Sequence, residues 1–219
     1  MIGAVSFWEY LGDNWERLRD LTIEHAQIVL MSVAIATLIG VSLGVLTYRT
    51  DRPRLAVLGV TGVFLTIPSF ALFPLMITYL GLGTTPSLVA LVMFALLPIV
   101  RNTITGLREV DPAVVESAQG MGMGRWRRLA RIELPLAWPI IITGIRVSTQ
   151  ILVGIAAIAA VINGPGLGKE IFRALASVGT PTAVNRALSA VLGIVILGLL
   201  LDIAYLFVGR LTTSRGLRE

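Results

Sequence analysis

Long apolar runs constrain the fold of this chain more than any other feature. Five of them occur among the 219 residues, at 26–48, 55–80, 87–105, 135–161 and 188–208. A helix needs roughly 20 predominantly apolar residues to cross the hydrocarbon core of a bilayer, and it satisfies its backbone hydrogen bonds internally, as the lipid interior requires. The sequence therefore predicts an all-α, multi-pass membrane protein with five transmembrane helices and no room for a second soluble domain.

The composition narrows the classes of function. Charged residues make up 14% of the chain and the mean hydropathy is +0.84, whereas a soluble domain usually carries about 25% charged residues. The chain has no cysteine and one histidine, His25. This excludes a thiolate nucleophile, a disulfide framework and a histidine metal cluster within the chain, so we predict neither catalytic residues nor a metal site.

The basic residues predict the orientation in the membrane. The net charge of +5 does not indicate nucleic-acid binding, because the arginines lie between apolar runs. Twelve of them, in 49–54, 101–131 and 210–218, fall on one side of a five-span chain, against five basic residues on the other. Basic residues favour the cytoplasmic side. We therefore predict an N-terminus outside and a cytoplasmic polar segment at 106–134.

The ends and the first two runs have distinct patterns. Residues 1–25 carry tryptophans among apolar positions, which predicts an amphipathic interfacial segment. The transmembrane domain is expected at 26–210 and a cytoplasmic tail at 211–219. The first run has a stripe of small residues that favours close helix packing: Ser32, Ala36, Gly40 and Gly44. The second run contains Pro68 and Pro74 and is interpreted as one kinked span, with two half-spans as the alternative.

The polar segment predicts two short helices joined by a sharp turn. Asp111 followed by Pro112 is typical of a helix N-terminus, which predicts a helix over 112–119. Glycines at 120, 122 and 124 allow backbone angles that other residues resist. A second helix over 125–134 would carry Trp126, Leu129 and Ile132 near one face, and Pro135 would begin the next span.

This segment resembles the EAA loop of permease subunits in bacterial ATP-driven (ABC) importers. Its pattern is Glu-x-Ala, three residues, Gly, nine residues and Ile-x-Leu-Pro, and the matching positions are Glu116, Ala118, Gly122, Ile132, Leu134 and Pro135. Ser117 stands where the family usually has alanine. The resemblance implies a MetI-like ABC importer permease fold with five core helices.

Other motifs resemble the branch that imports quaternary-amine osmoprotectants: glycine betaine, proline betaine, carnitine or choline. They are Ile67-Pro68-Ser69, the segment 97–103, Gly144-Ile145-Arg146 and the segment 164–168. At 164–168 this chain reads Gly-Pro-Gly-Leu-Gly, where the family more often has Gly-Gly-Leu-Gly.

The family resemblance implies a set of partners in the bacterial inner or plasma membrane. Two permease subunits, identical or sister chains, would pair in the lipid, and two separate ATPases would bind ATP and Mg²⁺ and grip the EAA loops. A separate extracytoplasmic binding protein would deliver the substrate. The chain itself would hold no cofactor, since its glycine-rich segment at 163–170 has Asn163 and Glu170 where a phosphate-binding loop needs glycine and serine or threonine.

The resemblance also implies coupling residues. They are Glu116, Ser117, Ala118, Gly122, Arg125, Arg128, Ile132, Leu134 and Pro135. Whether Arg125, Arg127 and Arg128 pair with acidic groups on the ATPase or only act as cytoplasmic retention charge stays open.

Polar and aromatic positions inside the spans are candidates for the substrate path. They are Pro68, Ser69, Phe73, Asn102, Ser148, Thr149 and Gln150. For residues 148–150, hydrogen bonding between packed helices explains the polar side chains as well as a place in the substrate path does. A structural partner is favoured for Arg146, because a fixed positive charge would repel a cationic substrate, and Asp202 is interpreted as reaching toward the membrane interface.

Three other functions are weighed. An importer for methionine or another amino acid would share the loop. A secondary transporter usually has two related halves, but residues 26–105 and 135–208 show no repeat. A membrane enzyme is disfavoured, because the spans offer no acid–base pair or activated nucleophile.

Overall fold

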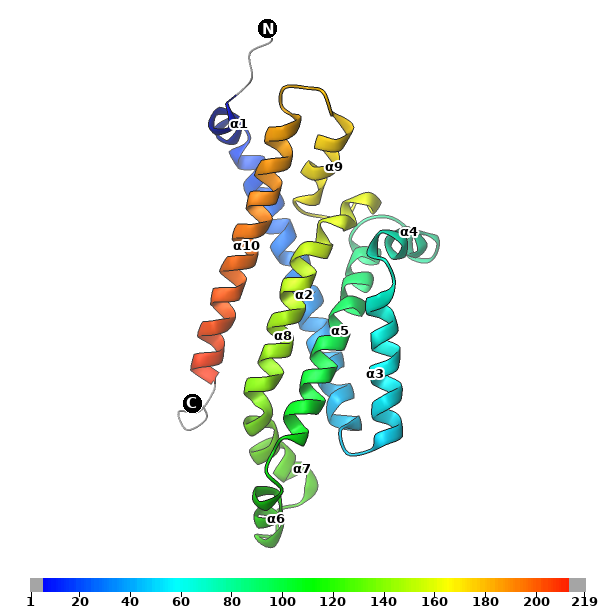
Figure 1. The fold of residues 1–219 in the computed structure, drawn as a ribbon, viewed down its shortest axis with the longest axis vertical. Coiled ribbons are helices and arrows are strands. Elements are labelled where there is room, and N and C mark those ends of the chain that lie inside the picture. The colour runs from blue at the N-terminus through cyan, green and yellow to red at the C-terminus, as the bar shows by residue number, and fades with distance from the viewer. Residues whose placement is uncertain (1–5, 213–219) are drawn as a thin grey trace.

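The computed structural model describes residues 6–212, and every regular element in that part of the chain is helical (Figure 1). The elements in order are α1 (Phe7–Asp13), α2 (Trp15–Thr47), α3 (Asp51–Thr66), α4 (Ser69–Leu80), α5 (Thr84–Arg108), α6 (Pro112–Gly120), α7 (Arg125–Arg128), η1 (Leu129–Glu133), α8 (Leu134–Ala156), η2 (Ile158–Ile162), α9 (Gly168–Ala176) and α10 (Ala183–Thr212). The all-α prediction is confirmed. Of the predicted N-terminal segment 1–25 and C-terminal tail 211–219, residues 1–5 and 213–219 lie outside the described residues.

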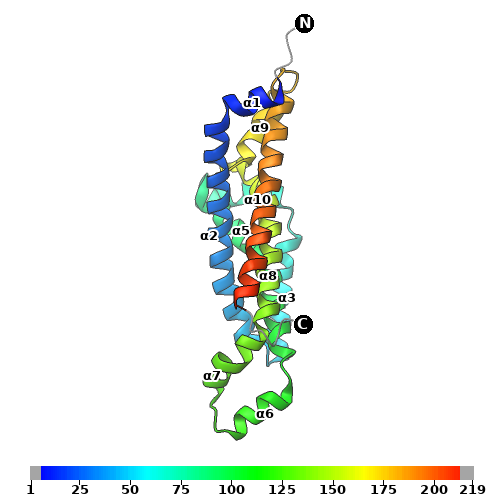
Figure 2. The same cartoon turned by 90° about the vertical axis from the view of Figure 1, so that its left-hand side faces the viewer.

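The long helices run along one axis, and each end of the molecule carries short helices. α6 and α7 project at one end, called the loop end below, and α1 and α9 lie at the opposite end, called the far end (Figures 1 and 2). Four helices are long and apolar enough to cross a membrane, and the count is five if α3 and α4 form one broken span. This agrees with the five predicted spans.

The second span is not the single kinked helix that we expected. α3 and α4 meet at an angle of 100°, and α4 lies across the long axis in Figure 1. Pro68 disfavours helical angles at the preceding residue, and Ile67 is accordingly extended, with φ −68° and ψ 125°. The 16 residues of α3 reach only about 24 Å at 1.5 Å per residue, which is shorter than a hydrocarbon core of about 30 Å.

α5 lies at the centre of the bundle, between α2 and α8. Its inward positions Ala90, Leu91, Ala95, Ile99 and Val100 are fully buried. The small-residue stripe predicted on the first span faces it, because the four stripe residues are buried on α2. α10 is the outermost long helix, with 11% of its most apolar window buried, which leaves most of its surface for lipid or for another protein.

Two helix ends differ from their predicted positions. α2 begins at Trp15 rather than near residue 26, because Leu18 and Leu21 extend its buried face by packing on Leu167. The fourth span does not begin at Pro135. A helix without a sharp bend runs from Arg125 to Ala156, and Pro135 is accommodated in the first turn of α8, where it adds no break.

A tight turn at the far end reverses the chain after α8. Asn163 takes a left-handed conformation with φ 60°, and α9 then begins at Gly168. A Cβ added at Gly168 would lie 2.0 Å from the carbonyl oxygen of Ala157. The glycine therefore lets α9 fold back directly onto the end of α8.

Candidate functional site

The candidate coupling site is the helical knob formed by α6 and α7 at the loop end. It extends beyond the helices of the bundle (Figure 2). Asp111 caps α6 by accepting a hydrogen bond from the Ala113 backbone N–H at 2.8 Å, and Pro112 occupies the first turn. The predicted helix start is confirmed, because a side-chain acceptor and a fixed φ favour helix initiation at these two positions.

Gly122 makes the joint between the two knob helices. Its φ is +77°. Its N–H donates to the Gln119 carbonyl oxygen at 2.9 Å, and the Met123 N–H donates to the Ala118 carbonyl oxygen at 3.1 Å. These two bonds form a Schellman motif, in which a left-handed residue just past the helix satisfies the last free carbonyls. Of the three glycines predicted to form the joint, Gly122 is the one with a positive φ.

The tip of the knob exposes apolar side chains. Val114, Met121 and Trp126 are 39%, 69% and 66% exposed, and the Arg125 guanidinium lies over the Trp126 ring at 5.7 Å. Trp126 and Leu129, which were predicted near one face of the second helix, differ in burial, since Leu129 is buried and Trp126 is exposed. Large apolar side chains exposed on a projecting segment are typical of a protein-binding surface. The sequence signal for them was the occurrence of apolar residues within a charged loop.

The predicted coupling residues divide between the surface and the interior of the knob. Ser117 bonds its own helix, donating to the Ala113 carbonyl oxygen at 2.7 Å. Ala118 is fully buried and supports the turn. Ile132 and Leu134 are half-buried against the bundle. The exposed members are Glu116, Ser117, Gly122, Arg125 and Pro135.

Arg128 does not face solvent, although both roles left open for it, pairing with the ATPase and acting as cytoplasmic retention charge, would place it at the surface. It is 4% exposed, and its Nε donates to a Glu133 carboxylate oxygen at 2.8 Å. Glu133 is 2% exposed and also accepts from Arg49 at 2.8 Å and from the Tyr48 hydroxyl at 2.6 Å. Burial, together with the bond to Glu133, raises the pKa of Tyr48. These four residues are called the Glu133 cluster below, and Arg128 is the one among them that was predicted as a site residue.

Comparison with known proteins identifies the family. Residues 36–214 match the model of the binding-protein-dependent transport system inner membrane component. The chain belongs to this family. As a permease component it is the non-catalytic membrane part of an ABC transport system, located in the inner membrane, and such a system implies ATPase and binding-protein partners.

Named relatives cover most of the permease. The osmoprotectant import permease protein OsmW of Salmonella typhimurium is 39% identical over 88% of this chain and 90% of its own length. The glycine betaine/carnitine/choline transport system permease protein OpuCB of Bacillus subtilis is 36% identical over 95% of this chain and 94% of its own. The choline transport system permease protein OpuBB of the same organism is 40% identical over 75% of this chain and 76% of its own.

A solved structure shares the fold of the permease. The MetNI methionine ABC transporter, in an inward-facing conformation, superposes with a TM-score of 0.78, covering 90% of this chain and 96% of that one. The sequence identity is 23%, so the likeness concerns the fold alone. The predicted MetI-like fold class is confirmed.

Arg146 has the in-chain partner that we expected. Its guanidinium binds the Asp202 carboxylate of α10 through two bonds of 2.6 and 2.7 Å. The interpretation of Asp202 as a residue reaching for the interface is wrong, because its two oxygens bind Arg146. The pair removes a net charge that would otherwise stand inside the membrane.

The predicted path residues of the permease are largely engaged in packing. Ser148 is buried and donates to the Ala95 carbonyl oxygen of α5 at 2.8 Å. The Thr149 hydroxyl donates to Ile145 at 2.9 Å, Gln150 reaches the Gly198 carbonyl oxygen at 3.0 Å, and Asn102 donates to Pro98 at 2.8 Å.

The remaining three path candidates lie at the junction of α3 and α4. Phe73 is fully buried, Ser69 is half-buried and Pro68 is exposed. Their part in a substrate path stays a prediction.

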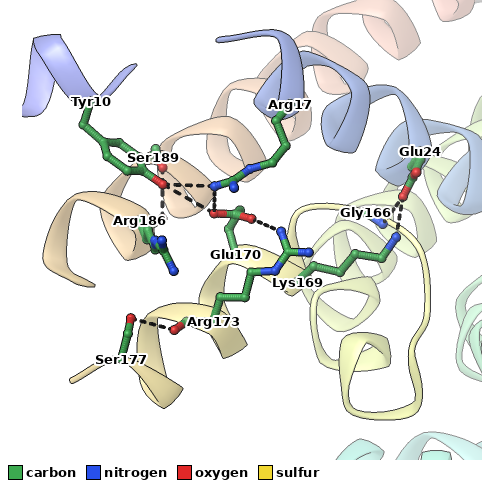
Figure 3. A network of polar contacts seen from close by, with 10 residues as sticks. All are labelled: Tyr10, Arg17, Glu24, Gly166, Lys169, Glu170, Arg173, Ser177, Arg186 and Ser189. Carbon is green, nitrogen blue, oxygen red and sulfur yellow. Dashed lines mark hydrogen bonds and ion pairs between the residues drawn. The ribbon is translucent and has the colours of Figure 1, made fainter. Parts of the chain in front are cut away.

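A second buried carboxylate joins three elements at the far end (Figure 3). Glu170 on α9 is fully buried and accepts from Arg17 of α2 at 2.6 Å and from Arg173 at 2.6 Å. The Tyr10 hydroxyl of α1 donates to it at 3.4 Å, and Arg186 of α10 lies beside them in Figure 3. Burial, followed by the nearby Glu170 charge, raises the pKa of Tyr10.

Replacing Glu170 with glutamine is expected to destabilise the far end by about 2 kcal/mol. The substitution keeps the size of the side chain but leaves the surrounding arginines without their counter-ion. Arg17 and Arg173 are 40% and 50% exposed, so water offsets part of the loss. Thermal unfolding of the purified permease in detergent measures the effect, with the exposed Glu9→Gln as the control. Equal melting temperatures for the two variants would contradict the expectation.

Proposed function

We propose that this permease is the membrane subunit of an ATP-driven importer for quaternary-amine osmoprotectants such as glycine betaine, carnitine and choline. The observation that carries the proposal is the set of relatives named for these substrates, which match 75–95% of the chain at 36–40% identity. The motifs at 67–69, 97–103 and 144–146 support the same substrate class.

The coupling role follows from the shape of the knob. A separate ATPase binds the exposed tip, where Val114, Met121 and Trp126 supply apolar area and Glu116 and Arg125 supply charge. The Gly122 turn fixes the angle between α6 and α7, so that closure of the ATPases moves the knob as one body. Two permease subunits, identical or sister chains, form the passage, and the knob lies in the cytoplasm with the N-terminus outside.

The charge arrangement in the spans is compatible with a cationic group in the passage. Arg146 is the one basic residue near the middle of α8, and Asp202 binds it at 2.6 Å. A guanidinium neutralised in this way repels a quaternary ammonium ion less than a free one at the same position. The ion pair therefore leaves no free positive charge at this position to oppose a cationic substrate.

Uptake of labelled substrates tests the proposal. The permease is co-expressed with its neighbouring ATPase and binding protein in cells that lack their own osmoprotectant systems. We expect ATP-dependent accumulation of labelled glycine betaine, choline or carnitine, and none with a catalytically inactive ATPase. Uptake of methionine instead, or of none of the three amines by an assembled complex, would show that the substrate class is wrong.

A further inference from the structure

Glu133 is buried at the point where the knob joins the bundle, and it occupies the position that the Ile-x-Leu-Pro pattern leaves unspecified. Its two carboxylate oxygens receive four hydrogen bonds, one from Arg128 of α7, two from Arg49 and one from the Tyr48 hydroxyl, all between 2.6 and 3.1 Å. The carboxylate thereby connects two parts of the chain that are 84 residues apart. A buried carboxylate bonded on all sides is held in one position.

The π-helical turn η1 is what brings Arg128 and Glu133 together. Five residues in an α-helix rotate by about 500°, which puts residues i and i+5 roughly 140° apart around the axis. In η1 the Leu134 N–H donates to the Leu129 carbonyl oxygen, five residues back, so the turn is wider. Residues 128 and 133 then face the same side and bond at 2.8 Å. Single π turns of this kind are frequent at functional sites.

The other side of the Glu133 cluster belongs to α2. Tyr48 is the C-cap of α2, and its carbonyl oxygen accepts from Arg108, the last residue of α5, at 3.4 Å. The end of α2 and the turn that begins α8 therefore meet at the buried carboxylate, and the end of α5 is joined to them through the Tyr48 carbonyl oxygen. The knob between α5 and α8 is attached here to a third helix with which it shares no adjacent sequence.

We propose that Glu133 is a positioning residue that transmits movement of the knob to α2. The inference rests on the coupling function proposed above. When an ATPase shifts the knob, the Glu133 cluster makes the loop end of α2 move with it. Without the carboxylate, the knob still binds the ATPase through its exposed tip, but its movement is absorbed at the junction and fails to reach α2.

Two substitutions in the cluster test the proposal in the assembled transporter. Glu133→Gln removes the charge, and the milder Tyr48→Phe removes one donor while the ring stays. Losing a hydrogen bond to a charged group corresponds to about a tenfold change in an equilibrium. We expect uptake per ATP hydrolysed to fall about tenfold in both variants, with complex assembly and ATP hydrolysis retained. Glu109→Gln, an exposed carboxylate at the same end, is the control and should match the wild type.

A second readout is independent of the transported substrate. The chain has no cysteine, so Glu16→Cys places a single thiol on the outer part of α2. ATP is expected to change the rate at which a maleimide labels this thiol, and the change should be lost in Glu133→Gln and in Tyr48→Phe. This response is expected even if the importer carries a different substrate, so its outcome is separate from that of the uptake experiment.

Two results would overturn the inference. One is normal uptake per ATP and an unchanged ATP-dependent labelling rate in both cluster variants. The other is loss of assembly and ATP hydrolysis along with uptake in Tyr48→Phe, which would make the Glu133 cluster a folding element only.

Discussion

Replacing Gly122 with valine is expected to abolish ATP-driven uptake while the permease still inserts and assembles. The residue has a φ of +77°, and left-handed angles cost an L-residue roughly 1–2 kcal/mol, with a β-branched side chain at the upper end. The valine variant therefore leaves the native turn, and α6 and α7 meet at a different angle. A Cβ at this position meets nothing within 4 Å, so the damage stays inside the knob.

Gly124→Val is the matched control for this experiment. Gly124 has a φ of −66° and a ψ of 159°, which a valine adopts readily, and its Cβ also meets nothing within 4 Å. Uptake of labelled substrate and ATP hydrolysis are measured for both variants in reconstituted complexes. Normal uptake with valine at 122 would refute the coupling role of the turn. An equal loss of uptake in both variants would show that added side-chain volume in the knob causes the effect, rather than the backbone angle at residue 122.

Gly168→Ala is expected to destabilise the whole permease by more than about 3 kcal/mol. The added methyl group would lie 2.0 Å from the Ala157 carbonyl oxygen and 2.7 Å from its carbon. Both are backbone atoms at the end of α8, so no side-chain rotation relieves the overlap. The first turn of α9 must move away, and Glu170 and its arginine partners move with it.

Gly154→Ala separates this steric effect from the general consequence of adding a methyl group. Gly154 is in α8, and its Cβ would meet nothing within 4 Å, so alanine there should leave the stability unchanged or raise it by up to about 1 kcal/mol. The yield of folded protein and its melting temperature in detergent give the comparison. A Gly168→Ala variant with the same melting temperature as the wild type would contradict the expectation, because it would show that the turn relaxes easily.

Local signals in the sequence predicted the parts of the fold that depend on neighbouring residues. Asp111 and Pro112 start α6 where they were expected to, and the glycine joint forms next to it, because capping and backbone preference act within a few residues. The long apolar runs predicted five spans, which the described helices provide if α3 and α4 count as one broken span. The angle at Pro68 was underestimated, since proline predicts a break but packing against neighbouring helices decides its size.

The pairings of buried charges needed the folded chain. Arg146 and Asp202 are 56 residues apart, and each on its own had a plausible explanation without the other. Arg128 looked like a surface residue in a basic loop, because an α-helical register points it away from Glu133. The π turn instead brings Arg128 and Glu133 to the same side of the helix. No pattern in residues 129–133 predicts such a turn.

The attachment of α2 at both ends gives it the mechanics of a strut. Its 33 residues form a rod about 50 Å long, tied to Glu133 at one end and to Glu170 through Arg17 near the other. An added Cβ would lie 2.8 Å from an Ile99 side-chain carbon at Gly40 and 2.5 Å from a Thr103 side-chain carbon at Gly44, so α5 lies directly against the part of the rod nearest the knob. We therefore expect α2 to shift as a whole rather than to bend, which would carry a displacement of the knob to the opposite face of the membrane.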